Sequence, residues 1–232
     1  MRAVAGAPFV IVVGTGGGEA RAAALLAAAH AVAAHHAQGA HATAPVARDT
    51  AVALDAPCGA ASLSSGALPC GRNLILLGGP HENAVAGALL ARQGGPPLRF
   101  AAPGGGAAFS LGGRNFTGEG DALLAVLPWW DPRPSLGGAR PAAPDAYAPF
   151  LQSSSPARLA LLVAAEGPAG IAAALALATP VIPPMVRPPF SNLAPDFMVL
   201  GADAPLRGWA GVKAAGSWDS DWRVDEAASF FA

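Results

Sequence analysis

The sequence has few charged residues, no run of basic residues and a single lysine. Charged residues make up 12% of the chain, and the formal net charge is −1. A nucleic-acid surface needs clustered lysine and arginine to displace counterions, so we expect no nucleic-acid partner. Lys213 stands alone among arginines, and Gly and Pro are abundant, which indicates a GC-rich coding sequence. This bias carries no functional signal by itself.

The chain also has no uninterrupted apolar run of the kind that spans a membrane. Residues 159–186 contain one charge, Glu166, but Gly167-Pro168 breaks the stretch and further prolines follow. A buried strand, a turn and a helix fit this segment better than a membrane span. The opening MRAVAGAPFVIVVG is a poor signal peptide, because it leads into a glycine turn without a separate cleavage region. These features leave localisation and oligomeric state open.

Cysteine is scarce, and its two copies flank a loop of small residues. Cys58 and Cys70 enclose GAASLSSGALP. We expect a disulfide between them, because this loop is flexible enough to bring its ends together, and closure would add about 3 kcal/mol. Two unpaired thiols in a reducing compartment are the alternative. Nearer the middle of the chain, Asn115-Phe-Thr is a sequon that would permit glycosylation of Asn115 in a secreted protein.

Apolar residues are abundant, at 53%, and they recur in one pattern. Continuous apolar runs at 9–13, 73–77, 159–163 and 197–200 are each followed by glycine and a helical stretch, at 19–36, 83–93, 169–178 and, weakly, 209–214. Such strands are typical of a sheet covered on both faces, and short turns into helices give parallel crossovers. We therefore predict an α/β fold with a doubly wound, mostly parallel sheet and helices on both faces.

The middle of the chain has a different composition and a different pattern of predicted elements. Residues 98–102 and 107–111, separated by Pro-Gly-Gly-Gly, predict a β-hairpin, and 123–127 predict another strand. Residues 131–156 are rich in Pro, Gly and Ser and too long for an ordinary connection. We interpret them as a surface loop inserted in a single Rossmann-like domain that covers residues 1–232.

The glycine turns after the first two strands are the candidate ligand site, because open α/β sheets bind ligands at the carboxyl ends of strands. The first turn departs from G-x-G-x-x-G, since Glu19 stands at its last position, where its charge would repel phosphate. The second turn lacks the Lys and Ser/Thr of a P-loop. We therefore expect structural turns and no cofactor. A small-molecule or nucleotide site remains the alternative, and its candidate residues are Gly14, Thr15, Gly78, Gly79, His81 and Asn83.

No complete catalytic apparatus is visible in the sequence. A nucleophile elbow, G-x-S-x-G, is missing, and three serines of the cysteine loop are explained by flexibility. Four histidines between positions 30 and 41 lack the i, i+4 spacing of two metal ligands on a helix, so we expect no metal site. We expect the tryptophans to pack rather than to form a binding platform, with at least two of Trp209, Trp218 and Trp222 substantially buried.

Several stretches together resemble one family. These are GAPFVIVVGT, NLILLGGPHENAVAGALL, the hairpin with PGGG, and above all PDFMVLGADAPLRGWAGVKAAGSWDSDW. They are similar to the C-terminal region of large fungal and algal proteins that carry an α/β-hydrolase domain of the prolyl-oligopeptidase type. The similarity runs over residues 6–224, whereas 131–156 and 181–189 depart from it as insertions.

The resemblance implies a non-catalytic accessory or interaction domain beside a serine-peptidase-like hydrolase, in an extracellular or secretory-pathway setting. The hydrolase domain, with its serine, aspartate and histidine, is absent from this sequence, so no catalytic residue is carried over. Two further hypotheses remain: a small-molecule or nucleotide-binding α/β domain, and an independent enzyme, for which the sequence shows no acid–base pair.

Overall fold

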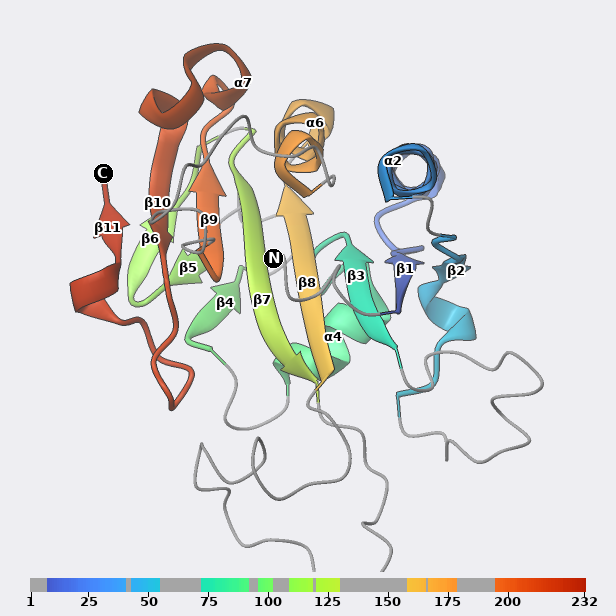
Figure 1. Cartoon of the computed structure of the whole chain (residues 1–232), viewed down its shortest axis with the longest axis horizontal. Helices are drawn as coiled ribbons and strands as arrows, with labels where there is room; N and C mark the ends of the chain where they lie inside the picture. The colour runs from blue at the N-terminus through green and yellow to red at the C-terminus, as the bar shows by residue number, and fades with distance from the viewer. Residues whose placement is uncertain are drawn as a thin grey trace, which may run out of the picture.

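The computed structural model describes residues 8–40, 43–54, 72–91, 96–101, 109–118, 120–129, 158–165, 167–178 and 195–232. Eight of the described strands form one large sheet (Figure 1). They are β1 (Phe9–Val13), β2 (Val46–Arg48), β3 (Asn73–Leu77), β7 (Ala122–Trp129), β8 (Arg158–Ala165), β9 (Phe197–Leu200), β10 (Val212–Gly216) and β11 (Phe230–Phe231). Their order across the sheet is β11-β10-β9-β7-β8-β3-β1-β2.

The large sheet is mixed, which confirms the α/β class and corrects the prediction of a mostly parallel sheet. Neighbours among β2, β1, β3 and β8 pair in parallel. The four pairings from β8 through β7, β9 and β10 to β11 are antiparallel. Parallel pairing needs a crossover of a dozen or so residues, whereas β9 returns into β10 through a short helical excursion. Antiparallel pairing is the result that so short a connection allows.

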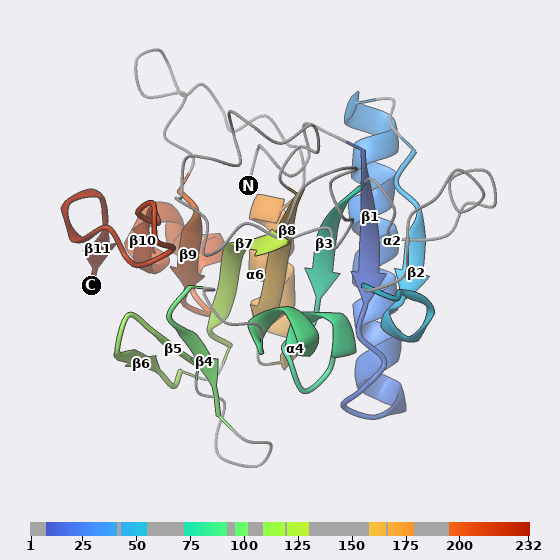
Figure 2. The ribbon, with the colours of Figure 1, turned by 90° about the horizontal axis from the view of Figure 1, so that it is seen from below.

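The large sheet contributes to two core clusters. Side chains of α2 (Glu19–Ala40) and α6 (Gly167–Ala178) join the first cluster. Side chains of α4 (Ala84–Leu90) join the second, together with a small antiparallel sheet of β4 (Leu98–Phe100), β5 (Phe109–Leu111) and β6 (Arg114–Phe116). Figure 2 shows α4 and β4–β6 on the same side of the large strands. Successive side chains of a strand point to opposite faces. Accordingly, Ile11 joins the core under α2, and Val12 joins the core under α4.

All the predicted strands, and the predicted helices except the last, correspond to observed elements, with shifted ends in several cases. The runs 9–13, 73–77 and 197–200 are strands with those bounds, and 159–163 lies inside β8. The hairpin is present as β4 and β5, and the strand at 123–127 lies inside β7. Residues 159–178 form β8 and α6, and within the described residues no helix is long and apolar enough to cross a membrane.

The helix predicted at 209–214 is wrong. Helix α7 (Ala204–Arg207) and the 3-10 turn η3 (Gly208–Gly211) come earlier, and residues 212–216 form β10 between β9 and β11. Tertiary pairing overrides the weak helical propensity of this segment. The cysteine pair and the predicted loop at 131–156 lie outside the described residues.

The tryptophans differ in their surroundings. Trp129 is buried in the core beneath the small sheet. Trp218 is partly buried against the same core: its ring lies 4.6 Å from that of Phe197, and its Nε1–H donates to the Val126 carbonyl at 2.9 Å. Trp222 is also partly buried, but Trp209 is 73% exposed, so packing does not account for it.

Candidate functional site

The strand order reverses between β1 and β3. From β1 the chain passes through α2 to β2 on one side, and the strands after β3 are added on the other side. The helices that follow β1 and β3 belong to different core clusters. In open α/β sheets, ligands bind outside the carboxyl ends of strands at such a switch point. All six candidate ligand residues lie here, in the turns 14–18 and 78–83.

The two turns are in direct contact. The Gly14 N–H donates to the Leu77 carbonyl at 2.9 Å, and the Gly16 N–H donates to the Glu82 carbonyl at 2.8 Å. A Cβ at position 14 would lie 2.6 Å from the Glu82 carbonyl oxygen, which no side chain tolerates. Gly78 has a φ of +103°, a conformation that L-residues rarely adopt. Glycine is therefore required here for close approach of one turn to the other.

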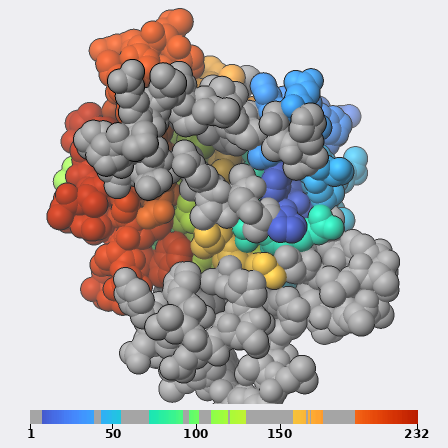
Figure 3. All heavy atoms as spheres, in the orientation of Figure 1, coloured from blue at the N-terminus to red at the C-terminus, as the bar shows by residue number. Residues whose placement is uncertain are grey.

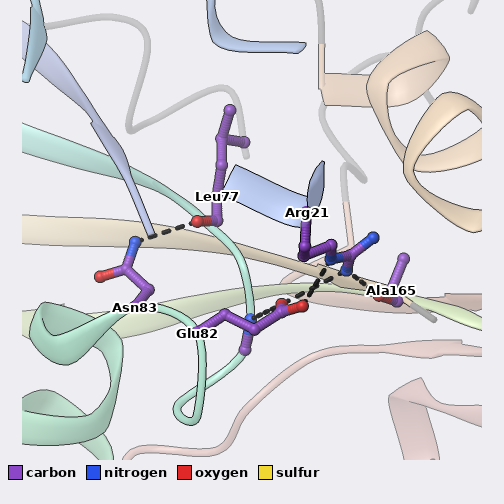
Figure 4. A network of polar contacts seen from close by, with 6 residues as sticks. Arg21, Leu77, Glu82, Asn83 and Ala165 are labelled. Atoms are coloured by element: carbon purple, nitrogen blue, oxygen red, sulfur yellow. Dashed lines mark hydrogen bonds and ion pairs between the residues drawn. The ribbon is translucent and has the colours of Figure 1, made fainter. Parts of the chain in front are cut away.

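A carboxylate of the protein occupies the space above the strand ends (Figure 4). The Arg21 Nε–H donates to Glu82 Oε1 at 2.5 Å, and the Gly79 N–H donates to Glu82 Oε2 at 2.9 Å. Arg21 also donates to the Ala165 carbonyl at the end of β8. The ion pair thus joins α2, the turn after β3 and β8. Because the N–H of Gly79 and the guanidinium already hold a carboxylate, they are not free to hold a phosphate.

Asn83 is the most enclosed polar residue of the site, with a side chain that is 0% exposed. Its Nδ2 donates to the carbonyls of Val12 at 3.1 Å and Leu77 at 3.0 Å. Its Oδ1 accepts from the N–H groups of Val85 and Ala86, which caps the N-terminus of α4. The side chain therefore joins β1, β3 and α4, and both of its polar atoms are engaged within the protein.

Thr15 is held by a residue that the sequence did not single out. Its hydroxyl donates to Asp49 Oδ1 at 2.7 Å. Asp49 is 4% exposed, lies in the 3-10 turn η1 (Asp49–Ala51), and accepts the Ala84 N–H on its other oxygen at 2.8 Å. Its carboxylate therefore joins the turn after β1 to the start of α4. We call Thr15, Arg21, Asp49, Glu82 and Asn83 the switch-point network.

His81, the best single candidate from the sequence, lies at the edge of this network. Its side chain is exposed and its Nε2 lies 2.7 Å from the Ala101 carbonyl, just after β4. No acid or base is within hydrogen-bonding distance of it among the described residues. The contact with Ala101 attaches the small sheet to the turn, and it is not a proton-transfer pair.

The other candidate residues are dispersed. Asn115 is exposed on β6. Among the described histidines, His30 and His35 are exposed, whereas His36 is 2% exposed and packs edge-on against Phe9 at 4.6 Å. Burial, with a smaller contribution from His35, lowers the pKa of His36. The described residues contain no cluster of three metal-ligating side chains.

Arg21 and Asp49 belong to the switch-point network, but they could not be identified from the sequence. An arginine in the first turn of an alanine-rich helix, directly after a glycine turn, was the one available signal for Arg21. Its partner is 61 positions away, so the pair could not be assigned from spacing.

Comparisons of the chain with protein-family models, with curated proteins and with solved structures found no match.

Proposed function

We propose that this chain is a non-catalytic accessory or interaction domain that packs against a serine-hydrolase domain of the prolyl-oligopeptidase type. The proposal draws on the resemblance of residues 6–224 to a region joined to such hydrolases. It is carried by one observation, an exposed apolar corner formed by Leu206 and Trp209. The corner lies within the stretch PDFMVLGADAPLRGWAGVKAAGSWDSDW, which gives that resemblance most of its specificity.

The apolar corner is built by the excursion between β9 and β10. Leu206 is 92% exposed and Trp209 is 73% exposed, whereas most large apolar side chains of the described strands are buried. Figure 3 shows this segment at the upper edge of the molecule, where α7 projects beyond the strand ends. Contiguous exposed apolar surface marks interaction sites, and these two side chains belong to one short segment, three positions apart.

The residues around the corner suit the rim of an interface. Arg207 Nη1 donates to Asp203 Oδ2 at 2.8 Å, and this hydrogen bond lowers the pKa of the Asp203 carboxyl. An exposed ion pair contributes little to the stability of the isolated chain. Interfaces typically combine a central aromatic residue with an arginine and a polar rim. The arrangement therefore supports docking of a protein surface on Trp209.

The proposal of a non-catalytic role draws on the switch-point network. Each of its polar side chains is engaged by another part of the protein. The Thr15 hydroxyl donates to the Asp49 carboxylate, but the other oxygen of that carboxylate accepts the Ala84 N–H, so we interpret the pair as a structural tie between the turn and α4. We further propose that β1, β3 and their helices form a doubly wound unit that serves as the scaffold.

The alternative, a small-molecule or nucleotide site at the glycine turns, is favoured by the reversal of strand order at β1 and β3. It is opposed by the Glu82 carboxylate, which takes the N–H that a phosphate would need. Thermal melts with ATP and with NAD separate the two proposals. We expect no change in melting temperature with either compound, and a rise of more than about 2 °C, lost in Gly79→Ala, would establish the alternative.

Direct binding tests the main proposal. A prolyl-oligopeptidase-type hydrolase domain encoded in the same genome is titrated with the chain by calorimetry. We expect a Kd in the micromolar range, with Trp209→Ser and Leu206→Ser each weakening it at least tenfold, or about 1.4 kcal/mol. Phe230→Ser is the matched control, since Phe230 is 46% exposed on β11, away from α7. Absence of binding at 100 μM, or equal loss in all three variants, would refute the proposal.

A further inference from the structure

A cavity beside the small sheet lies outside both the switch-point network and the apolar corner. It is bounded by β6, by the residues that precede β7 and by the start of β10, and its volume is about 510 Å³. Sites for small molecules usually enclose roughly 300–1,000 Å³. Its polar lining comes from Asn115, Thr117, Asp121 and Lys213. Asn115 and Thr117 are exposed on either side of the buried Phe116, as strand alternation requires.

The two charged side chains of the cavity neutralise each other. Lys213 Nζ donates to Asp121 Oδ1 at 2.6 Å, and Asp121 Oδ2 accepts the Gly118 N–H at 3.0 Å. The Asp121 side chain is 3% exposed, whereas that of Lys213 is 42% exposed. An ammonium group has three N–H donors. Asp121 takes one, and within the described part of the chain the other two remain available to the cavity.

The end of the Lys213 side chain lies close to two glycines. A Cβ at Gly118 would lie 2.7 Å from Lys213 Nζ, and one at Gly201 would lie 3.2 Å from Lys213 Cε. Glycine at both positions therefore leaves room for the end of this side chain beside Asp121. Lys213 is the one lysine of the chain, which has thirteen arginines.

The chemistry of the lining selects a class of ligand. An anion would approach the ammonium only beside the Asp121 carboxylate, which already neutralises it. An apolar ligand would leave the ammonium N–H groups unpaired, at a cost in free energy. Donors from Lys213 and both donors and acceptors from Asn115 and Thr117 match hydroxyl groups, which donate and accept at once.

We propose that this cavity binds a neutral polyhydroxylated ligand, of the size of a mono- or disaccharide. Lys213 and Thr117 hydrogen-bond its hydroxyl groups, and Asp121 holds the ammonium in place from beneath. The inference is independent of the proposed docking on a hydrolase, because it concerns a different surface and its own ligand.

Ligand-observed NMR and calorimetry test the site with glucose, N-acetylglucosamine, maltose and inositol, and with acetate and phosphate as anionic probes. The chain is produced in bacteria, so that Asn115 carries no glycan at the mouth of the cavity. We expect at least one neutral compound to bind with a Kd in the millimolar range. Lys213→Met and Thr117→Val should each weaken that binding by about tenfold or more.

Thr50→Val is the matched control, since Thr50 is an exposed threonine in η1, and its binding should equal that of the parent chain. If Lys213→Met fails to fold because Asp121 loses its partner, Thr117→Val and Asn115→Ala decide the question. The proposal is overturned if none of the four neutral compounds binds at 50 mM, if the variants bind them unchanged, or if acetate or phosphate binds more tightly.

Discussion

Replacement of Asn83 by alanine tests whether the switch-point network is a structural lock. The change removes the cap of α4, which costs about 1 kcal/mol, and two buried hydrogen bonds, which cost about 1 kcal/mol each. We therefore expect a loss of about 3 kcal/mol in the free energy of unfolding. Asn83→Asp keeps the cap but replaces both donors with a buried charge, so it should cost at least as much.

Urea unfolding followed by tryptophan fluorescence measures these losses, with the slope of the transition as a check on two-state behaviour. Asn115→Ala is the matched control, because Asn115 is exposed on an edge strand, and its effect should stay within about 0.5 kcal/mol. A loss below about 1 kcal/mol for Asn83→Ala would contradict the structural account. Such a small loss would instead favour a role for Asn83 in binding a ligand.

Three other predictions concern the core and the turns. Trp218→Ala should lower the free energy of unfolding by about 3 kcal/mol, because it removes a ring contact and an indole hydrogen bond. Trp209→Ala should change the free energy of unfolding by less than about 0.5 kcal/mol, since Trp209 is exposed. Urea unfolding followed by circular dichroism measures both, and equal losses in the two variants would refute the prediction. Since burial lowers the pKa of His36 below 6.5, the unfolded state takes up a proton that the native state does not. Stability should therefore fall as the pH drops below about 6.5, by at most about 1.4 kcal/mol per pH unit, and His36→Phe should remove that part of the pH dependence. Gly14→Ala should cost about 2 kcal/mol, because its Cβ would meet the Glu82 carbonyl, and an unchanged midpoint in urea would show that the turns are not in close contact.

The parallel half of the sheet could be predicted because its signal is local. The run 9–13 is apolar at every position and 73–77 is apolar after its first residue, Asn73, and both faces of those strands are covered. A strand with two buried faces must be apolar throughout, and the glycine that follows marks its end. Helix α2 followed equally from its alanine and leucine content.

The last two strands of the antiparallel half could not be predicted from local sequence. Residues 212–216, VKAAG, have no β-branched run beyond Val212 and form β10 only because β9 and β11 pair with it. β11 is two residues long, too short to leave a periodic signal. The prediction of a helix ending at 214 failed because pairing partners distant in sequence decide the conformation.

The glycine turns at the strand ends could be predicted from the sequence, but the contacts that they make could not. The rule that ligands bind at the carboxyl ends of strands drew attention to the turns at Gly14 and Gly78. Whether those turns leave room for a ligand depends on the Glu82 carboxylate and on two residues from other parts of the sequence, Arg21 and Asp49. Spacing within one turn holds no information about such pairs.

Hydrogen–deuterium exchange of the chain, alone and with the hydrolase domain, tests the central claim most directly. If the domain docks through the apolar corner, the amides of residues 204–211 should gain protection on mixing. The turns 14–18 and 78–83, already bonded to each other, should exchange at the same rate in both samples. Protection confined to those two turns, or none anywhere, would contradict the proposal that this chain is an interaction domain of a serine hydrolase.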